Sequence, residues 1–407
     1  KLLLILVLVA GALAKKRYDG YQVFRTVPAT DDQIQMIRTM HEHVELDFWT
    51  DTDVMVPPTL LDFVRQEFDS VDMYYEIAHE NVQEELDAEE LQLSTRTSKA
   101  FDLNNWNTYE QIIEALDFFV ANCPAGVSCS KVSMGSSYNG RDVPALTIRS
   151  GNKPLVYLDS LIHCREWLAG ATTLSIANRL ITGTDAEAAR LRDNYNWYIA
   201  PVINPDGYVY TWSNERLWRK NREPNQGSSC VGTDLNRNFD ASWRFSGTST
   251  LPCSDTYGGP SAGSAIETQN VQNKLNELAA SDNLYGVVSY HAYANMWLHA
   301  YGYTTISGGS TCARSAYHNQ INAVALAARN AIQSTGGQSW QYGPVCSVIY
   351  PASGSTVDYC HDKSGMVYAF TPEVRGNSFA PSASLIEPNY REQWAGLVAM
   401  VDAIAQQ

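Results

Sequence analysis

The sequence predicts an α/β protein with a largely buried sheet and flanking helices, preceded by a small, open-faced α+β module. Two patterns predict this. From residue 106 onward, segments of helical periodicity alternate with short apolar strands, which is typical of an α/β fold. Residues 20–80 instead alternate in the order β-α-β-β-α-β. A chain of 407 residues has room for both parts.

Residues 1–14 have one basic residue, a continuous apolar run and an Ala-Leu-Ala end. These features are typical of a secretory signal peptide. A core helix or a membrane anchor is the alternative, but the run is much shorter than the ~20 residues that a membrane span needs. We therefore expect residues 1–14 to be a signal peptide and the protein to be secreted and extracellular.

The front module is expected to contain two helices and an open sheet. Its first helix has a start signal at Thr30 and Asp31 with Gln33 following, and its second begins after Pro57 and Pro58. The expected helices are 31–40 and 58–68, and the expected strands are 21–27, 46–50, 54–56 and 73–77. Together they form a module of about 65 residues.

An acidic helical stretch at 80–95 is followed by a polar segment, 95–99, with two basic residues, Arg96 and Lys99. This segment has the composition of a cleavable linker, although an ordinary solvated helix and linker would look the same on charge alone. The sequence does not choose between Arg96 and Lys99 as the cleavage point.

The downstream elements follow in order. Between the two extended runs near 130 and 145, the Asn139-Gly140 pair is a hairpin signal, because it tolerates the positive φ of a type I′ turn. The expected strands are 145–149, 155–159, 197–203, 286–290 and 366–371, and the expected helices are 109–122, 171–181, 266–280, 316–333 and 390–405. Short apolar strands of this kind indicate a sheet that is covered on both faces.

Composition excludes several classes of function. The formal net charge is −15, and residues 15–99 contribute 8 basic against 19 acidic residues. Nucleic acid is therefore not an expected partner, because its binding needs clustered cations. The chain contains no P-loop and no G-x-G-x-x-G motif, and no stretch after the signal segment is typical of a membrane span.

A possible metal site follows the apolar strand 155–159. His163 and Glu166 lie three residues apart there, and an imidazole nitrogen and a carboxylate oxygen both suit zinc. A catalytic zinc site needs a third protein ligand and an open position for water. His291, which also follows an apolar strand, is the candidate, because ligands at strand ends converge where the loops meet.

Six segments together point to a known family: H-x-x-E-W at 163–167, N-E-R-L-W-R-K-N-R at 214–222, D-L-N-R-N at 234–238, S-Y-H-A-Y at 289–293, I-Y-P-A-S-G at 349–354 and F-T-P-E-V-R at 370–375. With these segments the chain resembles the zinc metallocarboxypeptidases of the pancreatic carboxypeptidase A/B type over essentially residues 105–407. The resemblance implies a central mixed sheet, a single bound Zn²⁺ and a zymogen whose front module is removed by tryptic cleavage.

The resemblance also implies the role of each residue. His163, Glu166 and His291 are the implied zinc ligands, with Asp234 accepting from the His163 ring. Glu373 is the implied general base, and Arg219 the cation that stabilises the tetrahedral oxyanion. The implied substrate-binding residues are Asn236, Arg237 and Tyr350 at the terminal carboxylate, Arg165 at an outer subsite and Val357 at the floor of the specificity pocket.

Val357 bears on substrate preference, because an apolar floor accepts apolar or aromatic C-terminal residues, whereas a carboxylate would pair with Lys or Arg. Asp358 is its neighbour, so an alignment shifted by one residue would reverse the conclusion. Further wall candidates are Leu298, Gly302, Val345 and Ala352.

All eight cysteines lie after residue 120, and their even number suits disulfides in an oxidising compartment. The residues alone leave the pairing open. The resemblance implies Cys230–Cys253 and Cys312–Cys346, which leaves Cys123 with Cys129 and Cys164 with Cys360 as possible pairs. Alternatively, Cys164 is a free, oxidation-sensitive thiol beside the metal.

The expected organisation is a signal peptide at 1–14, an inhibitory pro-domain with its linker at 15–99 and a catalytic domain at 100–407. The expected partners are peptide C-termini and an activating trypsin-like protease, with no nucleic acid, no membrane and a monomeric state. We also expect the acidic residues 80–90 to complement the arginine-lined substrate site. The alternatives are a carboxypeptidase for basic C-termini and an inactive zinc-binding homologue that binds peptides.

Overall fold

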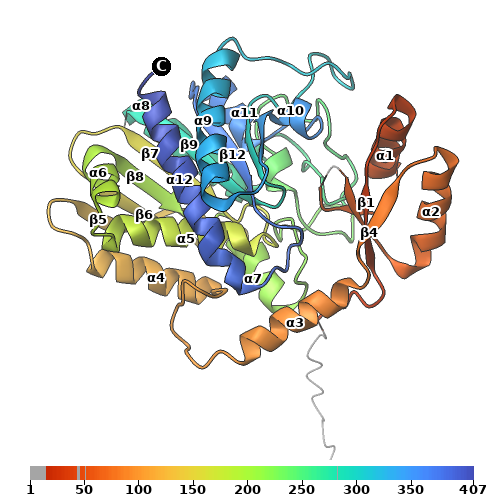
Figure 1. Cartoon of the computed structure of the whole chain (residues 1–407), viewed down its shortest axis with the longest axis horizontal. Coiled ribbons are helices and arrows are strands. Elements are labelled where there is room, and N and C mark those ends of the chain that lie inside the picture. Colours follow the sequence, from red (N-terminus) through yellow and green to blue (C-terminus); the bar gives the residue numbers. More distant parts are fainter. Residues whose placement is uncertain (1–14, 44–45, 51, 282) are drawn as a thin grey trace, which may run out of the picture.

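The structure, a computed structural model, describes residues 15–43, 46–50, 52–281 and 283–407 (Figure 1). The expected signal peptide lies outside this part of the chain. No helix in the described residues is long and apolar enough to cross a membrane.

The front module has the expected β-α-β-β-α-β order. Thr30 begins its first helix with a reciprocal cap, in which Gln33 N donates to Thr30 Oγ1 and Thr30 N donates to Gln33 Oε1, both at 3.3 Å. The strands are β1 (Gln22–Thr26), β2 (Asp47–Phe48), β3 (Asp53–Val56) and β4 (Tyr75–His79); the helices are α1 (Asp31–His43), the 3₁₀ turn Pro58–Leu60, α2 (Leu61–Ser70) and α3 (Val82–Ser94). The strands form an antiparallel sheet in the order β2-β3-β1-β4.

The large sheet is mixed, as the family resemblance implies. Its strand order is β11-β10-β12-β9-β7-β8-β6-β5; β7 is parallel to both β8 and β9, β12 is parallel to β9, and the pairs β5–β6, β6–β8 and β10–β12 are antiparallel. The strands are β5 (Ser128–Ser136), β6 (Asp142–Arg149), β7 (Leu155–Ser160), β8 (Asn196–Ala200), β9 (Leu284–Ala292), β10 (Met296–His299), β11 (Gln341–Pro344) and β12 (Ala369–Val374). A hairpin turn joins β5 to β6 as expected, but it is not of type I′, because Gly140 has φ at +82° whereas Asn139 is not in the positive-φ region. Gly140 N instead donates to the Ser137 carbonyl at 2.9 Å.

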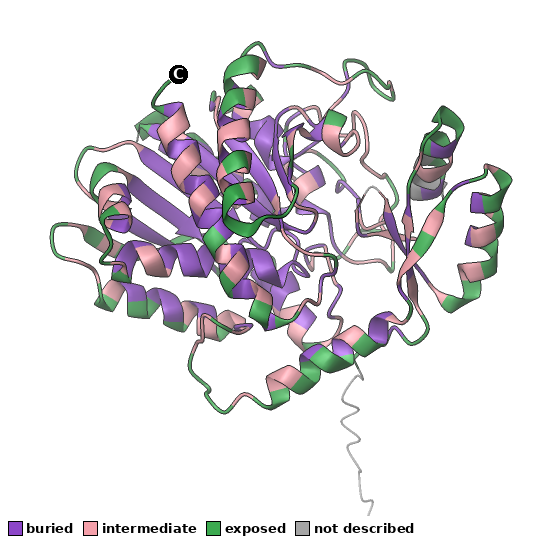
Figure 2. Cartoon of the chain, in the orientation of Figure 1, coloured by how far each residue is buried: buried purple, intermediate pink, exposed green. Residues whose placement is uncertain are grey.

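Helices cover both faces of the large sheet, whose strands are buried (Figure 2). Along β7 the side chains alternate: Val156 and Leu158 pack in one hydrophobic core, whereas Leu155 and Tyr157 pack in the other. The helices are α4 (Tyr109–Ala121), α5 (Trp167–Thr182), α6 (Ala186–Asn194), α7 (Pro205–Ser213), α8 (Ile266–Ser281), α9 (His318–Gly336), α10 (Val345–Val348), α11 (Thr356–Asp362) and α12 (Ile386–Ile404), with 3₁₀ turns at Leu235–Arg237 and Ala383–Leu385.

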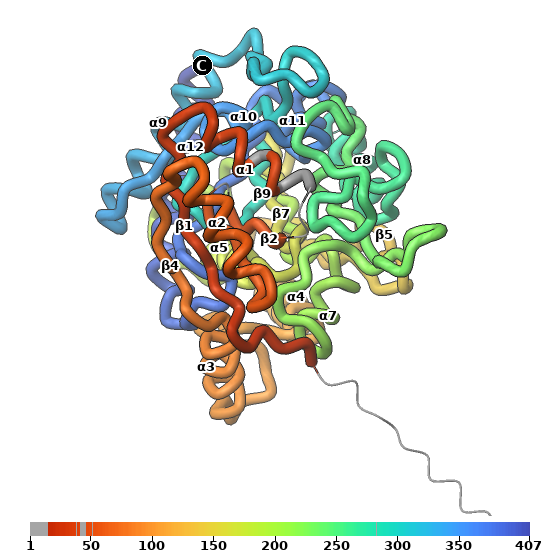
Figure 3. The backbone as a smooth tube through the Cα atoms, turned by 90° about the vertical axis from the view of Figure 1, so that its right-hand side faces the viewer, coloured from red at the N-terminus to blue at the C-terminus, as the bar shows by residue number. Residues whose placement is uncertain are grey.

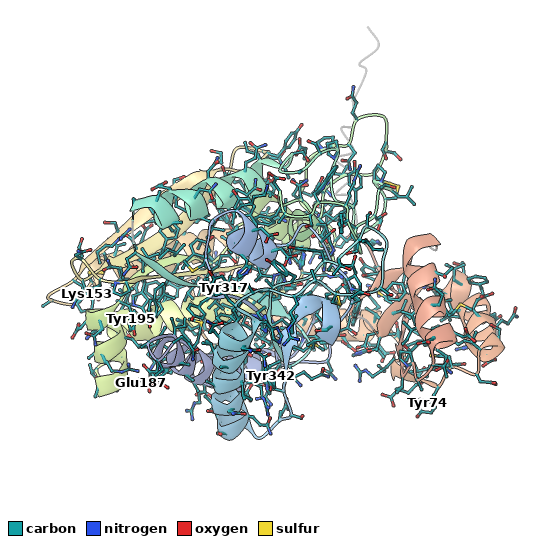
Figure 4. The ribbon with its side chains drawn as sticks, turned by 90° about the horizontal axis from the view of Figure 1, so that it is seen from above. Tyr74, Lys153, Glu187, Tyr195, Tyr317 and Tyr342 are labelled. Carbon is teal, nitrogen blue, oxygen red and sulfur yellow. A yellow bond between two sulfur atoms is a disulfide. The ribbon has the colours of Figure 1, made fainter. Side chains whose placement is uncertain are left out.

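The front module lies at one end of the larger body, in front of the loops that follow the central strands (Figure 3). Seen from above, Tyr74 marks the module's outer end and Lys153 the opposite end of the molecule (Figure 4). The parallel strands β7, β9 and β12 are neighbours, so the ends at Ser160, Ala292 and Val374 meet at one edge. This edge faces the module and carries the candidate site.

Candidate active site

His163 and Glu166 lie on the turn between β7 and α5. Leu161 opens this turn with φ at +54°, and its side chain packs so closely on Gly170 of α5 that a Cβ there would lie 2.6 Å from Leu161 Cδ1. The tight turn directs His163 and Glu166 to the same point, and His163 Nδ1 lies 2.7 Å from Glu166 Oε1. Both side chains are buried.

His291, near the end of β9, completes a three-residue cluster. Its Nδ1 lies 3.2 Å from His163 Nδ1 and 3.2 Å from Glu166 Oε2, and one ligand atom from each residue lies within 4.8 Å of the others. Burial lowers the pKa of His163, which favours the neutral, metal-binding imidazole. Two imidazole nitrogens and a carboxylate are a donor set that suits catalytic zinc, so the predicted ligands come together as expected.

Asp234 orients the cluster from the opposite side. Its Oδ1 lies 3.1 Å from His163 Nε2, and its Oδ2 accepts from Arg219 Nη2 at 2.9 Å and Nε at 3.1 Å. Burial opposes ionisation of Asp234, but the charge of Arg219 and the hydrogen bond of His163 hold its pKa well below the usual range. The carboxylate therefore fixes both the His163 ring and the Arg219 guanidinium.

Glu373 lies on β12 and is in register with His291 on β9. It lines the same cavity as His163, Glu166 and Arg219. Burial raises its pKa to about 7, and Glu166 adds to this effect. A carboxylate whose pKa is near neutrality has the proton affinity that a general base needs.

The three residues expected at a terminal carboxylate lie next to one another. Arg237 Nη2 donates to the Tyr350 hydroxyl at 3.2 Å, while its Nε and Nη1 donate to the carbonyls of Gly247 and Asn236. Asn236 Oδ1 accepts from Thr356 N at 2.9 Å, which directs its Nδ2 toward His291. All three line the cavity, and a planar guanidinium suits a carboxylate ligand.

The inner part of the cavity is mainly apolar. Val357, in the first turn of α11, lines it together with three of the four expected wall residues, Leu298, Val345 and Ala352. Further lining residues are Met296, Ile349, Ser355, Thr356 and Thr371.

Two residues near the pocket lie behind its wall. Gly302 is not among the described residues that line the cavity, and its amide donates to Asp358 Oδ1 at 2.9 Å. Asp358 is fully buried, lies outside that lining, and burial raises its pKa to about 7. The carboxylate beside Val357 is thus turned away from the pocket.

The front module closes the outer part of the same cavity. Leu46, Phe48, Trp49 and Thr50 line it opposite the candidate zinc ligands. Asp47 accepts from Arg165 Nη1 at 2.7 and 2.9 Å, so the arginine expected at an outer subsite is paired with the module.

Other contacts hold the module in place. Arg216 donates to Glu89 of α3 at 2.5 and 2.9 Å, and to the backbone carbonyls of Arg165 and Phe379. Asp53 Oδ2 accepts from the Tyr293 hydroxyl at 3.1 Å. The acidic stretch 80–90 therefore reaches an arginine of the larger body through Glu89, but Arg165, the arginine expected at an outer subsite, is met by Asp47 from outside that stretch. Sequence reasoning did not single out Asp47, Asp53 or Glu89, since acidic residues in a strongly acidic module carry no distinguishing signal.

The disulfides correct one expected pairing. Cys123–Cys129, Cys230–Cys253 and Cys312–Cys346 are bonded, but Cys164 and Cys360 are free and buried. Cys164 Sγ instead lies 3.4 Å from the Lys220 carbonyl and against Gly207, where a Cβ would come within 2.0 Å. Burial raises the Cys164 pKa well above the usual value, so the expectation of an oxidation-sensitive thiol is not supported either.

Comparison with known families agrees with both parts of the fold. Residues 112–396 match the family model described as zinc carboxypeptidase, and residues 24–89 match the model described as carboxypeptidase activation peptide.

Similar proteins span the whole chain. Carboxypeptidase A1 of Mus musculus is 34% identical, over 99% of this chain and 98% of its own length. Carboxypeptidase A2 of Rattus norvegicus is 33% identical over 99% of this chain and 98% of its own. Among solved structures, the carboxypeptidase A from Helicoverpa armigera superimposes with a TM-score of 0.86 at 28% identity, covering 96% of this chain and 98% of that one. Thrombin activatable fibrinolysis inhibitor gives 0.82 at 25% identity, over 96% and 100%.

Proposed function

The chain belongs to the zinc carboxypeptidase family, and we propose that it is the secreted zymogen of a metalloexopeptidase that removes apolar or aromatic C-terminal residues. In this proposal residues 1–14 are the signal peptide, 15–99 the inhibitory pro-domain with its linker and 100–407 the catalytic domain. The enzyme acts as a monomer on the C-termini of peptides and proteins.

His163, Glu166 and His291 would hold the zinc ion. A zinc ion held there would supply Lewis-acid polarisation of the scissile carbonyl and of the attacking water. Glu373 would take the proton from the attacking water and deliver it to the leaving amine, which its near-neutral pKa supports. Arg219, held by Asp234, would stabilise the oxyanion, and Asn236, Arg237 and Tyr350 would bind the terminal carboxylate.

One observation carries the proposed specificity: Val357 faces the pocket, while the neighbouring Asp358 is buried behind it. A substrate side chain that enters between Val357, Leu298 and Val345 meets apolar surface and no counter-charge. A Lys or Arg side chain would lose its hydration there without gaining a partner. Apolar and aromatic residues gain from the same burial.

The front module supports the zymogen part of the proposal. Asp47, Phe48 and Trp49 occupy the outer groove in which the upstream residues of a substrate would lie, so a trypsin-like protease would activate the enzyme by cutting within 95–99. The three disulfides suit the proposed secretion.

The test is hydrolysis of matched peptides ending in Phe, Leu, Lys and Glu, before and after limited trypsin, with and without a zinc chelator. We expect chelator-sensitive release of Phe and Leu that appears only after trypsin. Release of Lys in preference to Phe would establish the alternative specificity for basic residues. Retained zinc with no release from any peptide would establish the inactive, peptide-binding homologue.

A further inference from the structure

The two basic residues of the linker have different surroundings, although the sequence makes them equivalent. Arg96 follows the end of α3, and its guanidinium is bonded to the segment that begins α4. Nη1 donates to the Trp106 carbonyl at 2.8 Å and to Gln111 Oε1 at 3.2 Å, and Nη2 donates to the Asn107 side chain at 3.4 Å and to the Ala100 carbonyl. Arg96 thereby fastens the linker to the catalytic domain.

Lys99 is exposed, and so are its neighbours from Thr97 to Ala100. Among the described interactions its side chain makes no hydrogen bond or ion pair; only its carbonyl is bonded, to Gln111 Nε2 at 2.8 Å. A trypsin-like protease must insert the basic side chain into its own pocket. Lys99 can enter such a pocket at once, whereas Arg96 must first break its bonds to the catalytic domain.

The distance from α3 favours the same residue, although the Lys99 and Ala100 carbonyls accept hydrogen bonds from Gln111 and Arg96 that must open before the cut. Proteolysis requires the chain on both sides of the bond to open, and a helical segment must unfold before it is cut. Residues 96–99 and the residues just beyond them are neither helix nor strand, whereas Leu93 and Ser94, just before Arg96, still belong to α3.

We propose that the activating cut is hydrolysis of the Lys99–Ala100 bond. The Arg96–Thr97 bond is cut later, because the Arg96 side chain holds the linker to the catalytic domain. Water adds across this amide bond, leaving a carboxylate on Lys99 and an amino terminus on Ala100. The inference rests on the proposed zymogen function, but it concerns which bond is cut rather than what the enzyme then does.

The order of the two cuts follows from the contacts of Arg96. After the cut at Lys99, Arg96 still holds the catalytic domain through Trp106, Asn107 and Gln111, so the pro-domain stays attached through both Arg96 and Glu89. Residues 97–99 then form a free tail, and the Arg96–Thr97 bond can be cut once the Arg96 side chain leaves Trp106, Asn107 and Gln111. The second cut shortens the pro-domain and leaves the N-terminus of the catalytic domain at Ala100.

The test is a time course of the full-length zymogen with a low amount of trypsin, in which intact-mass spectrometry identifies both fragments. We expect the first catalytic fragment to begin at Ala100 and the first pro-domain fragment to end at Lys99. A first catalytic fragment that begins at Thr97 would overturn the proposal. This readout is independent of activity: clean cutting at Lys99 without hydrolysis of any peptide would refute the proposed function alone.

Variants show whether the exposure of Lys99, and not only trypsin's requirement for a basic residue, decides which bond is cut first. Lys99→Gln should slow the appearance of the catalytic fragment by about tenfold or more. Arg96→Lys keeps a residue that trypsin recognises but loses the forked contacts of the guanidinium. The rate of cutting after residue 96 should therefore rise by a factor of about ten, the effect expected for the loss of hydrogen bonds to a charged group, and compete with cutting after Lys99. Arg17→Gln, which removes an exposed arginine outside the linker, is the control and should change neither site, because the described contacts of Arg17 are with Asp19 and Asp87 and not with residues 96–100. An unchanged rate of cutting after residue 96 in Arg96→Lys would refute the proposed role of the Arg96 contacts.

Discussion

Asp358 offers a test of the pocket architecture that does not depend on activity. This carboxyl is fully buried behind Val357; its Oδ1 accepts from Gly302 N, whereas its Oδ2 has no hydrogen-bond partner within the described residues. Burial, which opposes ionisation, raises its pKa to about 7. In the unfolded chain the same group has the ordinary value of 3.8.

The sign and size of the effect follow from linkage. The folded protein holds a proton on Asp358 that the unfolded chain releases at a lower pH, so the associated stability is complete below about pH 4 and is lost as the pH rises through 7. The separation between 3.8 and about 7 corresponds to about 4 kcal/mol. Asn cannot ionise, so Asp358→Asn removes this loss, although its buried amide costs about 1–3 kcal/mol at every pH.

The assay is the free energy of unfolding, or the melting temperature, of wild type and Asp358→Asn between pH 4.5 and 8. We expect Asp358→Asn to have a lower free energy of unfolding than wild type at pH 4.5. Relative to wild type, its free energy of unfolding should rise by several kcal/mol as the pH increases to 8. Asp362→Asn, an exposed change at the end of the same helix, should show no such trend. A difference between wild type and Asp358→Asn that stays constant with pH would show that Asp358 is not a buried acid.

Four further predictions concern the site. Glu373→Gln should lower kcat by at least about 100-fold with little change in KM, measured on a Phe-terminated peptide. A zinc chelator should abolish hydrolysis by the wild type, and added Zn²⁺ should restore it. Val357→Asp should shift the ratio of kcat/KM values from Phe toward Lys by more than tenfold; no shift would place the pocket floor elsewhere. Cys164 should stay unmodified when a thiol reagent is added to the native protein and react after unfolding, as peptide mass mapping would show.

The fold could largely be predicted because its signals are local. Caps and turns such as Thr30 with Gln33, and Asn139-Gly140 in its hairpin, act through neighbouring residues. Boundaries were less accurate: the helix expected at 171–181 begins at Trp167, and the strand expected at 366–371 is Ala369–Val374. In both places most residues of the segment are buried, so the pattern of apolar residues does not mark where the helix or strand begins. The short helices α6, α7, α10 and α11 were not expected.

The residues of the candidate site could be predicted in part from physical chemistry, and otherwise only from family resemblance. His163 and Glu166 follow a strand in a metal-binding spacing, which is visible in one sequence. The nearness of Asn236 to His291, or of Arg237 to Tyr350, depends on contacts between distant segments. No periodicity encodes such contacts. The free Cys164 shows the same limit, since pairing by elimination ignored the backbone carbonyls and Gly207 that surround its sulfur.

The division of contacts between the two parts of the chain explains how such a zymogen can be inhibited without distorting its catalytic groups. Arg219 and His163 are held by Asp234, and Arg237 is held by backbone carbonyls, all within the catalytic domain. The module instead binds Arg165, Arg216 and Tyr293, which lie outside that set. Within the described residues, removal of the module therefore takes none of these hydrogen bonds from His163, Arg219 or Arg237. Activation needs only the opening of the outer groove, so its rate should be set by cleavage of the linker and departure of the module, and not by rearrangement of the active site.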